Sequence, residues 1–231
     1  MVSRSGVRKK KKKGFEWTRK KVLSLLFGAL LIFYVFPKIS SSVSSIQYKN
    51  QYFKVYREFS QAVALLQYKE EDFISSAKGS PEYFIEEFSS LFATDSLCKT
   101  EAPHCLTEGR LAYSTLDGRY YPEFLNKPNV GQFVLLDDVL VIVNLIDDNL
   151  WITVDINGIK KRPNRLGLDV FTFFLGGDEL NLRLMGSSGT PYMNLGKYCS
   201  LFESNEYNGL PCAYKAILDR EYFNDIKKYL K

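Results

Sequence analysis

Two aspartates and two asparagines lie close together in the sequence, and their side chains carry the oxygen atoms that calcium prefers as ligands. They are Asp155, Asn157, Asn164 and Asp169. One interpretation is a weak calcium site, although the spacing is not that of an EF-hand. The other is turn chemistry, in which Asn157-Gly158 supplies a positive φ, Pro163 stiffens the loop and the aspartates cap backbone amides. The sequence favours the turn role.

Catalytic patterns are missing from the rest of the sequence. The only histidine is His104, in a turn-rich stretch between Pro103 and Cys105. A Ser/His/Asp or Cys/His arrangement would have to use that one residue. The sequence contains no Walker loop, no G-x-G-x-x-G after a strand and no H-E-x-x-H. We therefore expect no catalytic residues and a protein that is not an enzyme, with no cofactor other than the weak calcium candidate.

The four cysteines suggest disulfides rather than a metal site. They stand at positions 98, 105, 199 and 212. Local pairing as Cys98–Cys105 and Cys199–Cys212 would close two short loops, and it is one of three connectivities that remain open. A zinc site is disfavoured, because neither pair has the close C-x₂₋₄-C spacing of structural zinc sites. An even number of cysteines is typical of chains that fold outside the cytoplasm.

Positive charge is concentrated at the N-terminus. Residues 1–21 hold ten Lys and Arg and one acid, whereas the other 210 residues hold 21 basic and 25 acidic side chains. A nucleic-acid-binding fold would carry its basic patch on the folded body. We therefore expect no direct contact with nucleic acid.

An uncharged apolar run, Val22–Phe36, follows the basic block. Such a run behind a cluster of Lys and Arg predicts a membrane span at about residues 22–37, with the N-terminus in the cytoplasm and the remainder outside. Release after a long signal peptide is a weaker alternative, since no A-x-A cleavage site follows.

The elements that must carry these residues change in type along the chain. Apolar residues at 46, 53, 56, 63 and 66 predict that the helix continues past the span to about Tyr68, with this stripe facing the folded body. Ser80-Pro81-Glu82 predicts the start of a short helix that runs to about Phe92. Residues 94–130 are rich in turn formers and predict an irregular region. Period-two segments then predict an antiparallel meander at 132–136, 139–145, 150–156, 170–175 and 180–185, followed by a final helix within 213–230.

This order of elements resembles the type IV pilins and the pseudopilins of type II secretion. Several segments carry the resemblance: the basic leader that ends in Gly14-Phe15, Pro37 at the end of the apolar run, Tyr56–Val63, the D-x-N-G…P-N…G-x-D-x-F pattern over Asp155–Phe171, and Cys199…Cys212-Ala213. The resemblance implies an α+β fold in which a long membrane-spanning N-terminal helix packs under a small antiparallel head. The expected segments are a leader at 1–14, the helix at 15–68 and the head at 69–231.

The resemblance also implies function and partners. It predicts a structural subunit of a pilus or pseudopilus in the bacterial inner membrane, cut by prepilin peptidase between Gly14 and Phe15, methylated at Phe15 and able to assemble with similar subunits. The sequence differs from the family at Arg19, where the family has a Glu. A cation there would be costly inside an apolar filament core. It favours the alternative, a monomeric signal-anchored envelope protein whose head binds a partner.

Overall fold

The computed structural model describes residues 45–70, 72–99, 106, 113–176 and 181–226. The chain divides after Val43, and all the described residues belong to the second unit, Ser44–Lys231. Residues 45–69 are helical throughout and are called the long helix below. The other elements are α2 (Phe73–Gly79), α3 (Pro81–Ser90), β1 (Thr94–Cys98), α4 (Glu123–Asn126), β2 (Gly131–Leu135), β3 (Leu140–Ile146), β4 (Asn149–Asp155), β5 (Val170–Leu175), β6 (Arg183–Leu184), α5 (Leu195–Tyr198), α6 (Cys212–Leu218) and α7 (Tyr222–Ile226).

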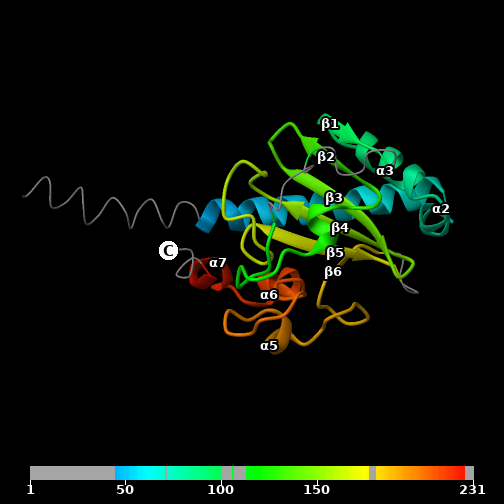
Figure 1. Ribbon diagram of the computed structural model, residues 1–231. Helices are drawn as coiled ribbons and strands as arrows, with labels where there is room; N and C mark the ends of the chain where they lie inside the picture. Colours follow the sequence, from blue (N-terminus) through cyan, green and yellow to red (C-terminus); the bar gives the residue numbers. More distant parts are fainter. Residues whose placement is uncertain (1–44, 71, 100–105, 107–112, 177–180, 227–231) are drawn as a thin grey trace, which may run out of the picture. The chain divides into compact units, whose positions relative to one another are not determined.

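The strands form one antiparallel sheet of six, and their order in space is their order in the chain (Figure 1). The β3–β4 turn shows how local sequence sets this topology. Asp147 and Asp148 have φ values of 49° and 56°, and they link Ile146 to its partner Asn149. Positive φ at both central residues is what a two-residue type I′ hairpin requires. The predicted antiparallel meander is therefore present.

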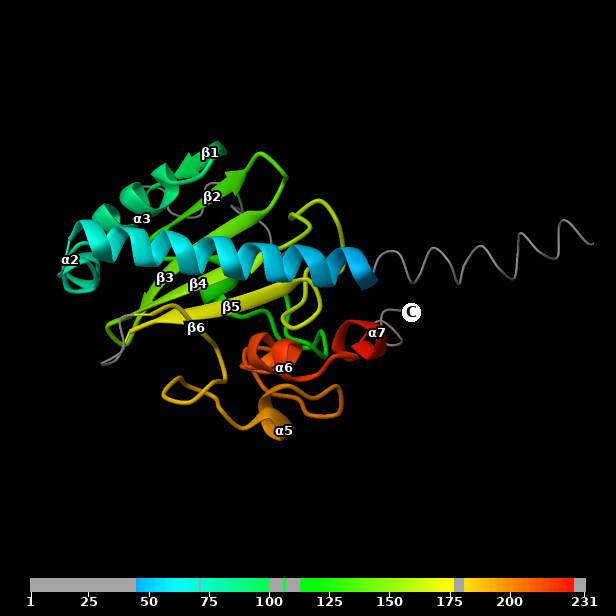
Figure 2. The ribbon, with the colours of Figure 1, turned by 180° about the vertical axis from the view of Figure 1, so that it is seen from behind.

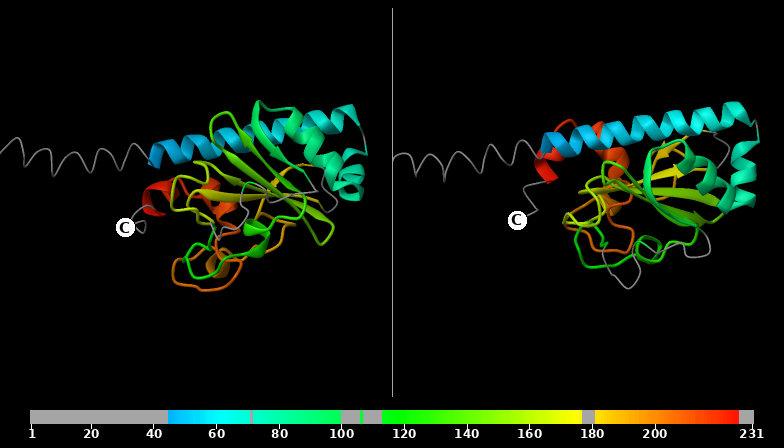
Figure 3. Two further views of the ribbon diagram at one scale, coloured as in Figure 1. Left: turned by 45° about the horizontal axis from the view of Figure 1, so that its top comes forward. Right: turned by 90° about the horizontal axis from the view of Figure 1, so that it is seen from above.

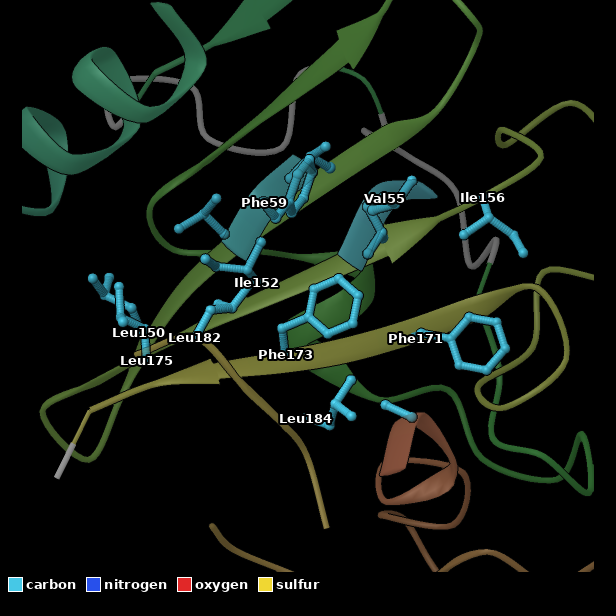
Figure 4. Packing of buried hydrophobic residues seen from close by; sticks show 14 of the residues in the cluster. Val55, Phe59, Leu150, Ile152, Ile156, Phe171, Phe173, Leu175, Leu182 and Leu184 are labelled. Carbon is cyan, nitrogen blue, oxygen red and sulfur yellow. The ribbon is translucent and has the colours of Figure 1, made fainter. Parts of the chain in front are cut away.

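The long helix lies across one face of the sheet (Figures 2 and 3). Its buried side meets alternate residues of β3, β4 and β5, which form one apolar cluster with it and with α2, α3, α6 and α7. Phe173 is fully buried in this cluster, and the close view shows it with Phe171 on β5, near Val55 and Phe59 of the long helix (Figure 4). This helix-on-sheet layer is the main core.

The other face of the sheet is covered without a long helix. A second apolar cluster forms there from strand residues such as Ile142 and Trp151, from Tyr113 and Leu125, and from Met185 and Leu210. The covering segments therefore come from the irregular region before β2 and from the chain after β6. Two threonines pair within this layer: the hydroxyl groups of Thr153 and Thr172 lie 2.9 Å apart and are buried.

The prediction of a membrane-spanning helix packed under the sheet is wrong for the helix that packs there. Among the described residues, no helix combines the length and the apolar character needed to cross a membrane. The long helix carries charged side chains along its length, including Lys49, Lys54, Arg57 and Glu58, so it is amphipathic rather than apolar all round. The predicted span at about 22–37 and the leader at 1–14 lie outside the described residues.

The predicted apolar stripe of the long helix is only partly correct. Val63 and Leu66 are buried, but Ile46 and Phe53 are 56% and 38% exposed. The buried stripe instead contains Tyr52, Val55, Phe59, Ala62, Val63 and Leu66. The predicted stripe is partly wrong because the helix has apolar residues on two faces. The spacing used for the prediction combined Ile46 and Phe53 of the exposed face with Val63 and Leu66 of the buried face.

The segments around α3 test the remaining predictions. The Ser80 hydroxyl accepts a hydrogen bond from the Tyr83 amide, with Pro81 at the first helical position, so the predicted helix start is confirmed. Phe84, Ile85 and Phe88 of this helix are buried. Strand β1 was not predicted, because its sequence TDSLC lacks alternation and most of it is exposed.

The disulfide Cys199–Cys212 is present and spans 13 residues. Cys98 is also disulfide-bonded, and its predicted partner Cys105 lies outside the described residues.

The Cys199–Cys212 disulfide closes a loop of a length that stabilises a fold by about 3 kcal/mol. We expect the Cys199→Ser/Cys212→Ser variant to lose about that much free energy of unfolding, measured by urea titration. A loss below about 1 kcal/mol would contradict the chain-entropy estimate.

Candidate functional site

The loop between β4 and β5, residues 156–169, holds three of the four residues singled out as oxygen donors, and the fourth is the strand residue just before it. Asp155 ends β4 and Asp169 immediately precedes β5, and both are 0% exposed. The antiparallel pairing of the two strands explains why acids fourteen residues apart come together, since Asp155 pairs with Val170. The loop thus begins and ends on a buried carboxyl group.

Each carboxyl group binds backbone amides of the loop. Asp155 Oδ1 accepts hydrogen bonds from the amides of Asn157 and Gly158, at 3.2 and 2.8 Å. Asp169 accepts from the amides of Asn164 and Arg165, at 2.9 and 2.8 Å. Gly158 and Asn164 have positive φ, at 82° and 56°. These contacts are the turn chemistry that the sequence favoured.

Two tyrosines from distant parts of the chain complete the site. The Tyr113 hydroxyl donates to Asp155 Oδ2 at 2.9 Å and is buried. Asn157 Nδ2 donates to the Tyr48 hydroxyl of the long helix at 3.1 Å. We call residues 155–169 the acid loop. Its hydrogen bonds to Tyr113 and Tyr48 connect it to the covering layers on both faces of the sheet. Sequence reasoning missed both tyrosines, because nothing in the local pattern links residues 42 and 109 positions away.

The pKa values of both carboxyl groups are raised above the usual value of an aspartate. Burial, and then the neighbouring charge of Asp169, raise the pKa of Asp155 to about 8. Burial also raises the pKa of Asp169, to about 6, against the lowering effect of the Arg165 and Asn164 amides. Burial likewise raises the pKa of Tyr113 well above its usual value. At neutral pH one carboxyl group of the pair therefore holds a proton.

The geometry supports a structural role more directly than a metal-binding role. All four carboxylate oxygens of the pair accept hydrogen bonds from protein donors. The side-chain oxygens of Asn157 and Asn164 are buried and have no hydrogen-bond partner. Within the described residues, no group of three or more His, Cys, Asp or Glu is placed to hold a metal ion. Calcium binding at Asp155, Asn157, Asn164 and Asp169 stays a prediction.

The second candidate site is a surface of the long helix. We call it the outer face and define it by Ile46, Phe53, Ala64 and Tyr68, which recur at whole numbers of helical turns. Phe53 and Tyr68 are 38% and 89% exposed. A shallow groove lies on this side of the helix, lined by Phe53, Tyr56, Arg57, Ser60, Gln61 and Ala64. The helix therefore has one apolar side on the sheet, and its outer face exposes apolar side chains that alternate with polar ones such as Arg57 and Gln61.

A cavity of about 350 Å³ lies beside the disulfide. Its lining includes Leu116, Cys199 and Phe202 on one side, with Lys215, Tyr222 and Ile226 from the C-terminal helices. Phe202 is 87% exposed. Asp219 and Asp225 also line it, and a mainly apolar lining with a few charged groups is typical of a ligand or peptide contact site.

The processing residues Gly14 and Phe15, together with Arg19 and His104, lie outside the described residues. Of the predicted site residues, the structure brings together the four oxygen donors and the Cys199–Cys212 pair.

Comparisons with known proteins add no family: no family model, no curated protein and no solved structure matches this chain.

Proposed function

We propose that this chain is a non-enzymatic structural subunit of a filament of the type IV pilus or type II secretion pseudopilus kind. One observation carries the proposal: the outer face of the long helix leaves the large apolar side chains of Ile46, Phe53 and Tyr68 exposed. A helix of a folded protein normally turns its polar side to solvent. Apolar residues on both sides are expected where a second partner packs against the helix.

The disulfides support a compartment outside the cytoplasm. Cys199–Cys212 is closed, and the described cysteines are all disulfide-bonded. Structural disulfides persist in oxidising compartments and are rare in the cytosol. This supports placing the folded unit outside the cytoplasm, at the bacterial envelope, where a filament subunit would be used. Prepilin peptidase would act at Gly14 and an N-methylase at Phe15.

Cysteine crosslinking in cells tests the packing of the long helix. Ala64→Cys places a thiol on the outer face, and we expect oxidation to give a disulfide-linked dimer of the full chain. Ser188→Cys is the matched control, since Ser188 is exposed but lies in the loop after β6, and it should stay monomeric. In the same sample, mass spectrometry should find a methylated N-terminus at Phe15.

Two outcomes would overturn the proposal. One is an absence of Ala64→Cys dimers at expression levels that give folded protein, and the other is an intact leader before Phe15. The second candidate function, a monomeric envelope protein whose folded unit binds a partner, is favoured by the cavity beside Cys199. It predicts an absence of self-crosslinks and a contact between Phe202 and another protein.

A further inference from the structure

A cluster of positive charge lies on the loop between β4 and β5. Lys160, Lys161 and Arg162 are exposed, and Arg165 is half-buried. The two acids that bound the loop are fully buried and do not neutralise this surface. Lys161 lies 3.5 Å from Asp138, and both side chains are more than 60% exposed. Such a solvated pair contributes little, so the loop presents a net positive surface.

The loop holds these cations in place. Its amides are bound by Asp155 and Asp169, and the Lys161 amide donates to the Gly158 carbonyl at 2.9 Å. A preorganised charge loses less conformational freedom on binding than one on a free loop. We call Lys160, Lys161 and Arg162 the basic loop.

The complementary charge lies on the solvent side of α3. Glu82 and Glu86 are exposed and one helical turn apart, and Glu87 beside them is half-buried. Glu86 pairs with Lys99. Among the described residues, Glu82 and Glu87 have no ion-pair partner. We call Glu82, Glu86 and Glu87 the acidic face.

The basic loop and the acidic face lie toward opposite ends of the long helix (Figures 1 and 2). The bond between Asn157 and Tyr48 ties the loop to the first turns of that helix. The helices α2 and α3 follow its last turn. Residues 45–69 of a straight helix span ~37 Å, and among the described residues no ion pair joins the two charged surfaces of one copy.

We propose that the basic loop of one copy contacts the acidic face of a second copy, head to tail along the direction of the long helix. This inference rests on the proposed filament and names the surfaces that set its axial contact. A head-to-tail contact leaves a free copy of each surface at the two ends, and it extends as an open chain where the rotation between copies does not close a ring. Opposite charges also steer encounter and fix the register between subunits.

Zero-length crosslinking tests the contact directly. Assembled full-length protein, mixed from ¹⁴N- and ¹⁵N-labelled cells, is treated with a carbodiimide that joins an ammonium to a carboxylate in contact. We expect mixed-isotope peptides in which Lys160 or Lys161 is joined to Glu82 or Glu86. Crosslinks from these lysines to a different acid, or binding of the basic loop to phosphatidylglycerol vesicles in place of any lysine–glutamate crosslink, would overturn the proposal.

Charge reversal gives the matched controls. Lys160→Glu/Lys161→Glu should lower the assembled fraction about tenfold, the effect of ~1.4 kcal/mol. Adding Glu82→Lys/Glu86→Lys in the same chain should restore assembly, whereas Arg119→Glu, an exposed site elsewhere, should change nothing. If Ala64→Cys dimers persist while the reversal has no effect, the charge contact is wrong and the filament proposal stands. Loss of the Ala64→Cys dimers in the unreversed chain would instead reject the filament itself.

Discussion

Phe173→Ala is expected to lower the free energy of unfolding by about 3–5 kcal/mol. Phe173 is fully buried at the centre of β5. Its ring lies 5.7 and 6.2 Å from the rings of Tyr56 and Phe59 on the long helix. On the neighbouring strands it pairs with Ile152 and Leu184. Removing the ring leaves a cavity between helix and sheet that the rigid strands cannot fill.

Urea unfolding followed by near-ultraviolet circular dichroism measures this loss, because the aromatic core gives the signal. Phe202→Ala is the control: its side chain is 87% exposed, and its replacement should shift stability by no more than about 0.5 kcal/mol. Equal effects of the two substitutions would show that the long helix does not pack on β5 as described.

The stability of the fold is expected to fall as pH rises from about 4 to about 8, the reverse of ordinary carboxylates. Burial raises the pKa of Asp155 to about 8 and that of Asp169 to about 6, whereas an unfolded Asp titrates near 3.9. The folded state therefore binds more protons than the unfolded state in this window. Stability is fully present below about pH 4 and is lost as pH passes through the folded pKa values.

The size of this effect follows from the shift of Asp155. One pKa unit corresponds to about 1.4 kcal/mol, so the loss is on the order of 3–5 kcal/mol between pH 4 and pH 8. Urea unfolding in a pH series measures it. Asp155→Asn keeps an acceptor for the loop amides and removes the titrating group, so its profile should be much flatter. A native stability that rises between pH 5 and pH 8 would contradict a protonated pair.

The central strands were predictable because their sequences alternate and end in turn-forming residues. Strand β5 has the predicted bounds, and β3 and β4 differ from the prediction by one residue. Their side chains are buried on both faces, yet the two-residue turn at Asp147-Asp148 still identified the hairpin. Strand β1 escaped detection because a sheet edge with polar residues has no apolar period.

The helix that packs on the sheet shows the limit of periodicity. An apolar residue at the correct spacing predicts that a face is covered, but it does not say by what. Phe53 and Val63 entered one predicted stripe, although the structure places Val63 on the sheet and exposes Phe53. Only the contacts in the folded structure distinguish an apolar residue that packs in the core from one that remains exposed and available to another molecule.

The acid loop was predictable in part for a similar reason. Its turn residues and capping aspartates are local, so the sequence contains them. The raised pKa values are not local, because they arise from burial under two layers of the fold and, for Asp155, from the neighbouring charge of Asp169. A sequence pattern identifies the titratable groups, but it does not show how completely folding removes them from solvent.

The sheet described above has consequences for the order in which the chain folds. Every strand pairs with its immediate predecessor and successor in the chain, so pairing can begin while later residues are still being delivered across a membrane or from a ribosome. Contacts of short sequence separation also favour rapid folding. The long helix makes contacts of much longer separation, and one of them is the hydrogen bond from the Tyr52 hydroxyl to the Ala213 carbonyl, 161 residues further along the chain. Until that last stretch arrives, the first turns of the long helix lack one of their anchors, and during that interval the chain is open to a chaperone or a premature partner.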